Sequence, residues 1–390
     1  MKKLEIKDNN QKNTKMKIAT FNIQNLFHRD KSLIKPPAGK CVLNWINEMN
    51  FLMRKILKSG GDLERMKELS FLLGFENCNP VPYAVMRKRG GELFLKGSGG
   101  SLENKASSIS EWNGWVPVQT VPLNPVATEN KAKVIAEGNS DILLLQETED
   151  RNSLKEFNLE FLPKYNMVPY GEQLVLQGND PKGRELGLLT KNGFTVQGIK
   201  TYMDDRNDKN DLLFDKNVLQ YEITTPSGNI FWLIAVHFIG TAKDKETTDG
   251  IRFQQAYRVA ELYQEMRREG KLNVLVAGTF NAVSYCHSLS PLLQETDLKD
   301  VAKHSGFNVD LDTGKDSNYY RLGAYRMGVN IKQKDYILLS PEMFKRVKSA
   351  GLNRKAVWPD KPGKWQVYNS LQNRDQAASD HPMVWAEIDL

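Results

Sequence analysis

Short apolar runs that begin or end on a polar residue recur along the chain. Six of them carry an amide, a carboxylate or an imidazole at one end, and they span residues 18–22, 141–147, 231–237, 273–281, 335–340 and 379–390. Such runs, bounded by turn residues, are typical of strands buried on both faces. Helical spacing occurs at 252–270 and at 128–140, where Thr128 is the expected N-cap. Many strands and few helices predict an α/β protein with two packed sheets and helices outside.

The segment between the first two runs is far longer than a usual connection. Within it, residues 42–57 and 63–75 have helical apolar spacing, which predicts a mostly helical insert at about 30–125. Residues 1–15 are polar and lysine-rich, as expected of a frayed tail. The chain is therefore predicted to form one domain over residues 16–390 that contains this insert.

Composition narrows the class of protein. Of the 390 residues, 40% are hydrophobic and 26% are charged, which is the profile of a globular domain. The net charge of +7 favours anionic partners such as nucleic acids or phosphate esters. Three scattered cysteines argue against a disulfide framework or a zinc site. No apolar run is long enough for membrane insertion, and the polar N-terminus is unlike a signal peptide, so a cytoplasmic location is expected. No pattern indicates an oligomeric state.

The polar residues at the strand ends suit the hydrolysis of a phosphate ester. Glu147 offers the hard oxygen ligand that Mg²⁺ prefers, and Asn22 can add a neutral oxygen. His381, oriented by an acid such as Asp335, can contact the phosphate or move a proton. Singly, each residue has an ordinary explanation, such as an exposed strand-end acid. Their joint occurrence favours one shared site.

Six segments in order resemble the successive motifs of the endonuclease/exonuclease/phosphatase superfamily. They read FNIQNLF, ILLLQETE, AVHF, AGTFN, KDYILLS and SDHPMV. The resemblance implies a four-layer α/β sandwich, in which two mixed sheets lie face to face between helices, with a long insert after the first strand. It also implies a Mg²⁺ or Mn²⁺ cofactor.

The resemblance further assigns roles to individual residues. Asn22 and Glu147 would sit at the metal, and His237 and His381 would flank the phosphate. Asp335 would orient His381. Asn281 would hold the scissile phosphate, and Asp380 would sit beside the metal or the imidazole. Arg184 would contact the phosphate.

One position departs from the family pattern. The usual motif is Gly-Asp-Phe-Asn, whereas this chain has Gly278-Thr279-Phe280-Asn281. The usual aspartate is commonly assigned as the general base, and a threonine hydroxyl cannot take up a proton near neutral pH. Three interpretations stay open: a slow or inactive site, another acid in its place, or a subfamily in which metal-bound hydroxide suffices.

The leading functional hypothesis is a Mg²⁺-dependent phosphodiesterase, an endonuclease-like enzyme acting on nucleic acid. A basic cluster at Arg87, Lys88 and Arg89 and the aromatic residues Trp112 and Trp115 are compatible with a nucleic-acid partner. One alternative is a phosphatase acting on a phosphomonoester or a lipid head group. Another is a binding module whose catalysis is weakened because threonine replaces the usual aspartate.

Overall fold

The structure is a computed structural model of the whole chain. It describes residues 14–30, 40–72, 87–88, 91–92, 94–96, 102–104, 114–115, 120–149, 151–176, 178–180, 183–240, 244–308, 333–359 and 365–390. The predicted tail lies almost wholly outside these residues. The side chains of the proposed basic cluster at 87–89 and of Trp112 and Trp115 lie outside the described part as well.

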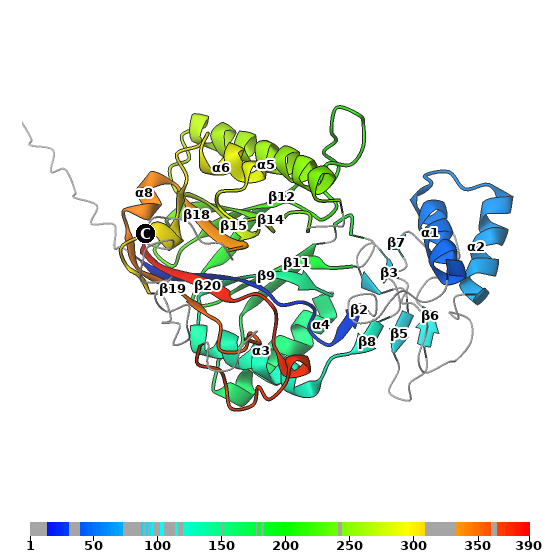
Figure 1. Cartoon of the computed structure of the whole chain (residues 1–390), viewed down its shortest axis with the longest axis horizontal. Coiled ribbons are helices and arrows are strands. Elements are labelled where there is room, and N and C mark those ends of the chain that lie inside the picture. Colours follow the sequence, from blue (N-terminus) through cyan, green and yellow to red (C-terminus); the bar gives the residue numbers. More distant parts are fainter. Residues whose placement is uncertain are drawn as a thin grey trace, which may run out of the picture.

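Two mixed sheets form the centre of the molecule (Figure 1). The seven strands of the first sheet run in the order β10 (Glu172–Leu176), β11 (Glu185–Thr190), β9 (Ile142–Thr148), β1 (Lys15–Asn22), β20 (Met383–Asp389), β19 (Val347–Asn353) and β17 (Phe307–Asn308). The six strands of the second run in the order β12 (Thr195–Thr201), β13 (Leu219–Thr224), β14 (Ile230–His237), β15 (Val274–Thr279), β18 (Asp335–Leu339) and β16 (Lys299–Asp300). Parallel pairs occur at β1–β9 and at β14–β15, and most of the other pairs are antiparallel.

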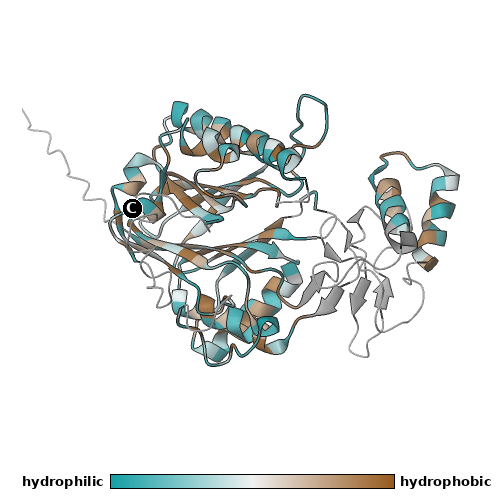
Figure 2. Ribbon diagram, viewed as in Figure 1, coloured by the Kyte–Doolittle hydropathy of each residue, from teal (hydrophilic) through white to brown (hydrophobic). Residues whose placement is uncertain are grey.

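Alternation along the strands separates three apolar clusters and so defines four layers. Side chains such as Ile18, Leu144 and Leu275 point between the sheets and form the central core. The neighbouring residues point outward. The outer face of the second sheet packs on α5 (Lys245–Arg268), and the outer face of the first packs on α3 (Pro125–Gly138). Figure 2 shows the apolar colouring concentrated along the strands and on the inner sides of the helices. The predicted four-layer α/β sandwich is confirmed.

Two helix starts differ from the sequence prediction. Helix α3 begins at Pro125, and Asn124 is its N-cap because its Oδ1 accepts a hydrogen bond from the Val126 N–H at 3.0 Å. The prediction of Thr128 as N-cap is wrong, since Thr128 is itself a residue of the helix. Its hydroxyl donates to the carbonyl oxygen of Leu26. Helix α5 likewise begins two turns before the predicted 252, because Asp244 caps it.

The remaining elements are shorter or belong to the segment after β1. The helices are α1 (Lys40–Arg54), α2 (Gly60–Leu72), α4 (Arg151–Glu156), α6 (Ser290–Leu293) and α8 (Pro341–Phe344), with single helical turns at Phe157–Phe161, Leu162–Tyr165, His287–Leu289, Val301–Lys303 and Arg374–Gln376. The short strands are β2 (His28–Asp30), β3 (Arg87–Lys88), β4 (Gly91–Glu92), β5 (Phe94–Lys96), β6 (Leu102–Asn104), β7 (Gly114–Trp115) and β8 (Thr120–Pro122).

Helices α1 and α2 lie together at one end of the molecule, apart from the two sheets (Figure 1). Both predicted helices of the insert are therefore present, and the division of the chain into a tail, a domain and an insert stays a prediction. Among the described helices, none combines the length and the apolar character needed to cross a membrane.

Candidate active site

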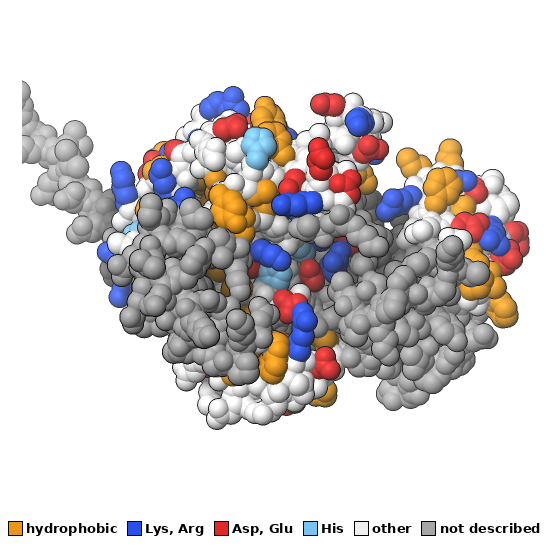
Figure 3. All heavy atoms as spheres, viewed as in Figure 1, with side chains coloured by type: hydrophobic (Ala, Val, Ile, Leu, Met, Phe, Trp, Pro, Cys, Tyr) orange, Lys and Arg blue, Asp and Glu red, His pale blue; other side chains and the backbone are white. Residues whose placement is uncertain are grey.

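The polar ends of five strands face one another across the two sheets. In the second sheet, His237 at the end of β14 pairs in register with Thr279 of β15, and Thr279 pairs with Asp335 of β18. In the first sheet, Asn22 of β1 pairs with Gln146 of β9. Figure 3 shows a hollow between the layers in which acidic, basic and histidine side chains gather. Strand ends that meet in this way place side chains from distant parts of the sequence in one site.

Thr279, Asp335 and His381 form the first half of the site, here called the aspartate–histidine half. Nδ1 of His381 lies 2.8 Å from Oδ2 and 3.0 Å from Oδ1 of Asp335. The hydroxyl of Thr279 lies 2.7 Å from Oδ1 of the same carboxylate. All three side chains are buried, which places them in a region of low dielectric. Two donors, the Thr279 hydroxyl and the His381 imidazole, hold the carboxylate there. The predicted pairing of Asp335 with His381 is present.

Burial and charge act in opposite directions on His381. Burial lowers the pKa of this imidazole, but the charge of Asp335 and its hydrogen bond outweigh that effect, so the net pKa is raised above its usual value. The backbone N–H of His381 donates to the hydroxyl of Ser379, which in turn donates to the carbonyl oxygen of Asn22. The Ser-Asp-His segment is thereby tied to the end of β1.

Glu147, Asn22, His237 and Arg184 form the second half, here called the glutamate half. Oε1 of Glu147 lies 3.4 Å from Nδ2 of Asn22, 3.7 Å from Nε2 of His237 and 3.9 Å from an Arg184 guanidinium nitrogen. Glu147 is 8% exposed, and its backbone φ of +61° lies in the left-handed region. A non-glycine residue rarely adopts that conformation outside turns and functional sites.

His237 is kept neutral by its surroundings. Burial lowers its pKa well below the usual value, and the positive charges of Lys216 and Arg184 lower it further. Its Nδ1 is buried and has no hydrogen-bond partner among the described residues. Lys216 is a residue that the sequence analysis missed. It lies in the loop before β13, its ammonium group is paired with Asp215 at 2.6 Å, and no apolar period marks such a loop residue in the sequence.

Arg184 reaches the glutamate half from the start of β11. Its Nε lies 2.6 Å from Oδ2 of Asp180, which holds the guanidinium group beside Glu147. Burial lowers the pKa of Arg184, but the charges of Asp180 and Glu147 more than compensate, so the group stays positively charged. Its predicted contact with the phosphate stays a prediction. Glu185, the next residue, accepts a hydrogen bond from the Gly178 N–H at 2.7 Å.

Thr279 joins the two halves. Besides its contact with Asp335, its hydroxyl accepts a hydrogen bond from Nδ2 of Asn22 at 3.3 Å and lies 3.3 Å from Oε1 of Gln146. The residue before it has to be a glycine. Gly278 has φ of +139°, and a Cβ there would lie 1.9 Å from the carbonyl oxygen of Val236. Strands β14 and β15 thus approach each other closely beneath Thr279.

Two predicted site residues, Asn281 and Asp380, lie outside these two groups of contacts. Nδ2 of Asn281 donates to the carbonyl oxygen of Phe238 at 2.8 Å, and the residue has φ of +55°. The side chain of Asp380 is 54% exposed, and its described ion pair is with Arg374 at 3.7 Å. Neither residue has a described side-chain contact with Glu147 or His381. Their predicted roles stay predictions.

The donor set of the glutamate half fits a magnesium ion. Mg²⁺ keeps several waters and needs only one or two carboxylates, so Glu147 with an amide oxygen is sufficient. Nδ2 of Asn22 faces Glu147 and Thr279 while its Oδ1 accepts from the Gln24 N–H, so the amide oxygen would have to turn toward Glu147 to act as a ligand. Within the described part of the chain, no group of three or more His, Cys, Asp or Glu side chains is placed to bind a metal. A single carboxylate with an amide oxygen suits a hard cation that keeps most of its waters.

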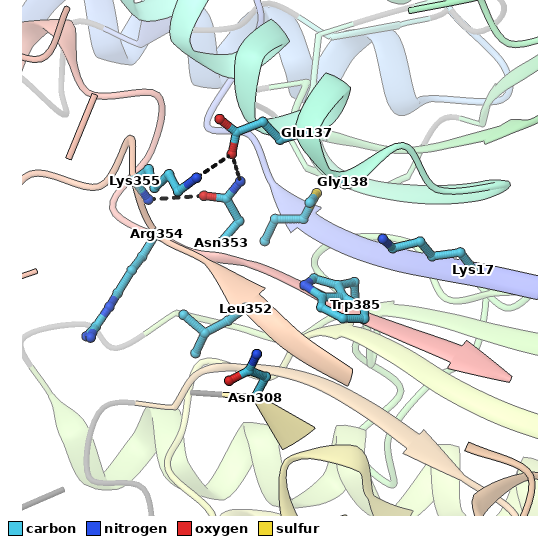
Figure 4. Close-up of a pocket in the computed structure, with 10 residues that line it drawn as sticks. Lys17, Glu137, Gly138, Asn308, Leu352, Asn353, Arg354, Lys355 and Trp385 are labelled. Carbon is cyan, nitrogen blue, oxygen red and sulfur yellow. Dashed lines mark hydrogen bonds and ion pairs between the residues drawn. The ribbon is translucent and has the colours of Figure 1, made fainter. Parts of the chain in front are cut away.

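A separate pocket of about 520 Å³ lies near the C-terminal end of α3 (Figure 4). Lys17, Glu137, Asn353, Lys355 and Trp385 are among its lining residues. Its polar side chains already pair with one another, since Glu137 accepts from Lys355 at 3.0 Å and from Asn353 at 3.1 Å. None of the predicted site residues lines it, so it is separate from the strand-end site.

Comparison with known proteins gives structural matches only. No protein-family model and no curated protein sequence matches the chain. An endonuclease/exonuclease/phosphatase family protein from Bacteroides thetaiotaomicron is 13% identical over 97% of this chain and 98% of that chain, with a TM-score of 0.47. A mannosyl-6-phosphatase from the same organism is 14% identical over 67% of this chain and 91% of that chain, with a TM-score of 0.45. The catalytic domain of human Nocturnin is 15% identical over 66% of this chain and 85% of that chain, with a TM-score of 0.44.

Proposed function

We propose that this chain is a metal-dependent phosphoester hydrolase of the endonuclease/exonuclease/phosphatase type. The observation that carries the proposal is one continuous series of contacts between residues distant in the sequence. It runs from Arg184 and His237 through Glu147, Asn22 and Thr279 to Asp335 and His381. A network of this kind, buried between two sheets and rich in titratable groups, is typical of a catalytic site.

The two halves have different tasks in this reaction. Glu147 and Asn22 would hold Mg²⁺ or Mn²⁺, which polarises a phosphoryl oxygen and stabilises the leaving oxyanion when bound. His381 has its Nδ1 fixed by Asp335, so Nε2 is the atom that donates to a phosphate or leaving-group oxygen. Arg184 supplies a fixed positive charge beside the same region. Asn281 can donate its second amide hydrogen to the phosphate while the first stays on Phe238.

Nucleic acid is the proposed substrate, as a phosphodiester. The net charge of +7 supports it, because a polyanionic backbone is attracted by a positive surface. The intact network also favours hydrolysis over binding alone. The charged residues of both halves are present and in contact, whereas a site that no longer catalysed would have no need to keep them together.

The test is a substrate panel with the purified chain. Plasmid DNA, single-stranded RNA, bis-p-nitrophenyl phosphate and p-nitrophenyl phosphate are incubated with Mg²⁺, with Mn²⁺ or with EDTA. Metal-dependent cleavage of the diesters that is lost in Glu147→Gln and kept in Glu160→Gln, an exposed carboxylate, supports the proposal. Cleavage of the monoester alone would instead indicate a phosphatase. Retention of DNA on a filter without turnover of any substrate would contradict hydrolysis and indicate a binding module.

A further inference from the structure

The hydroxyl of Thr279 lies near two hydrogen-bond acceptors but has only one proton to donate. It lies 2.7 Å from Oδ1 of Asp335 and 3.3 Å from Oε1 of Gln146, and both of these oxygens are acceptors. A hydroxyl carries one proton, and a hydrogen bond to a carboxylate is shorter and stronger than one to an amide oxygen. Thr279 therefore donates to Asp335. Its lone pairs remain for the Asn22 amide, which donates to it at 3.3 Å.

A carboxylate at this position would have the opposite effect. Thr279 is fully buried, and Asp335 is 3% exposed. Two carboxylates within hydrogen-bond distance in such a place cannot both be ionised, so they would share a proton. A neutral donor leaves the whole negative charge on Asp335, where it faces the imidazole of His381.

We propose that Thr279 is a positioning residue that acts through Asp335, its hydroxyl fixing the carboxylate that orients His381. This inference rests on the proposed hydrolase function, because the orientation serves a reaction at His381. Register supports it, since Thr279 and Asp335 lie directly opposite each other on the antiparallel strands β15 and β18. The threonine is thus an adapted part of the site and not a failed general base.

Three substitutions separate the possible roles of this side chain. Thr279→Val keeps the shape and removes the hydroxyl, Thr279→Ser keeps the hydroxyl, and Thr279→Asp restores the residue usual in the family. We expect Val to lower kcat by about 10- to 100-fold with KM nearly unchanged, the loss of one hydrogen bond to a charged group. Ser should recover most of that activity, and Asp should not exceed the wild type. A fully active Val variant, or an Asp variant faster than the wild type, would overturn the inference.

A second readout does not depend on activity. In protein labelled with ¹⁵N-histidine, the Nδ1 proton of His381 bonded to Asp335 gives a downfield signal, assigned by its absence in His381→Ala among the five histidines of the chain. We expect the Thr279→Ser variant to keep this signal and the Thr279→Val variant to shift or broaden it. Thermal unfolding of each variant checks that it is folded.

The two readouts distinguish failure of the inference from failure of the proposed function. A signal that responds to residue 279 in a chain without hydrolytic activity would refute the function while supporting the link from Thr279 through Asp335 to His381. Activity combined with a signal indifferent to residue 279 would refute the link and leave the function intact.

Discussion

The two halves of the site differ in how completely the protein satisfies its own charged groups. In the aspartate–histidine half, Asp335 has two hydrogen-bond partners, the Thr279 hydroxyl at 2.7 Å and Nδ1 of His381 at 2.8 and 3.0 Å from its two oxygens. In the glutamate half, the contacts of Glu147 Oε1 are 3.4, 3.7 and 3.9 Å long. The first set has the lengths of strong hydrogen bonds, and most of the second is too long for hydrogen bonds.

This difference indicates how the work is divided between the two halves. The aspartate–histidine half is oriented by protein groups alone, so its geometry depends on packing and on hydrogen bonds between the sheets. In the glutamate half, Asp180 holds Arg184 at 2.6 Å, but Oε1 of Glu147 has no close contact with the imidazole or the guanidinium group, which leaves this oxygen available to a cation. Substitutions in the two halves should therefore fail in different ways.

The largest effect is expected for His381→Ala. Removal of a group that transfers a proton or donates to the phosphate lowers kcat by about 10²- to 10⁴-fold. Because this half is organised by the protein, raising the Mg²⁺ concentration should not recover the loss. A titration of kcat with Mg²⁺ in wild type and variant tests this. Recovery at high Mg²⁺ would show that the two halves are not independent.

Gly278→Ala should disrupt the support beneath the aspartate–histidine half. The added Cβ would lie 1.9 Å from the carbonyl oxygen of Val236, so β15 must move away from β14. Strain at such a backbone position alone costs about 1–3 kcal/mol, and the clash adds to it, so we expect at least about 3 kcal/mol lower free energy of unfolding. Urea unfolding measures this value.

Gly250→Ala is the matched control for that substitution. This glycine lies in α5, and apart from its chain neighbours and the backbone of its own helix, no atom lies within 4 Å of an added Cβ. Alanine in a helix is favoured over glycine by roughly 0.5–1 kcal/mol, so this variant should be slightly more stable than the wild type. Similar losses in both variants would argue that the close approach of β14 and β15 is unimportant.

Glu147→Gln should change the dependence on the metal. Replacement of a metal-binding carboxylate by an amide weakens Mg²⁺ binding, and loss of even a supporting partner costs about 10- to 100-fold in affinity. We expect the Mg²⁺ concentration for half-maximal activity to rise at least that much. Mg²⁺ should also stabilise the wild type in thermal unfolding more than the variant. An unchanged Mg²⁺ requirement would place the metal elsewhere.

The sequence predicts the two sheets well for a physical reason. β9, β15 and β18 are buried along their whole length, so each is an almost unbroken apolar run with its site residue at one end. The start of α5 was harder to place, because the turn that Asp244 caps consists of polar residues, and the start of α3 depends on the cap that the Asn124 side chain forms. Patterning identifies buried faces, and caps depend on local hydrogen bonds.

Within the site, the sequence predicts residues at strand ends but not the contacts between them. Thr279 and Asp335 are 56 positions apart, and only the pairing of β15 with β18 brings the hydroxyl to the carboxylate. Lys216 was missed because it acts on His237 through charge from a loop. Its neighbour Asp215 also masks it, since the pair resembles an ordinary solvated ion pair in the sequence.

The smallest effect on kcat is expected from a change of pH. This effect distinguishes the role of His381 from that of His237. The pKa of His381 is raised above its usual value of about 6.5 and that of His237 is lowered well below it, so His381 keeps its proton to a higher pH than His237 does. If protonated His381 serves the reaction, kcat should be level at pH values well below this raised pKa and fall as the pH rises through it. The stability that this pair contributes follows the same sign, because a raised pKa in the folded state stabilises at low pH and is lost as the proton leaves.

Asp335→Asn tests the origin of that pH dependence. The substitution removes the charge that outweighs burial, so the pKa of His381 should drop and the falling limb of the profile should move to lower pH. The measurement is kcat against pH for wild type and variant on one diester, at saturating Mg²⁺. A limb at the same pH in both proteins would assign the titration to another group. If the wild-type kcat instead rises as the pH rises through the pKa of His381, the reaction requires a deprotonated His381. Its role would then be that of a proton acceptor and not of a proton donor.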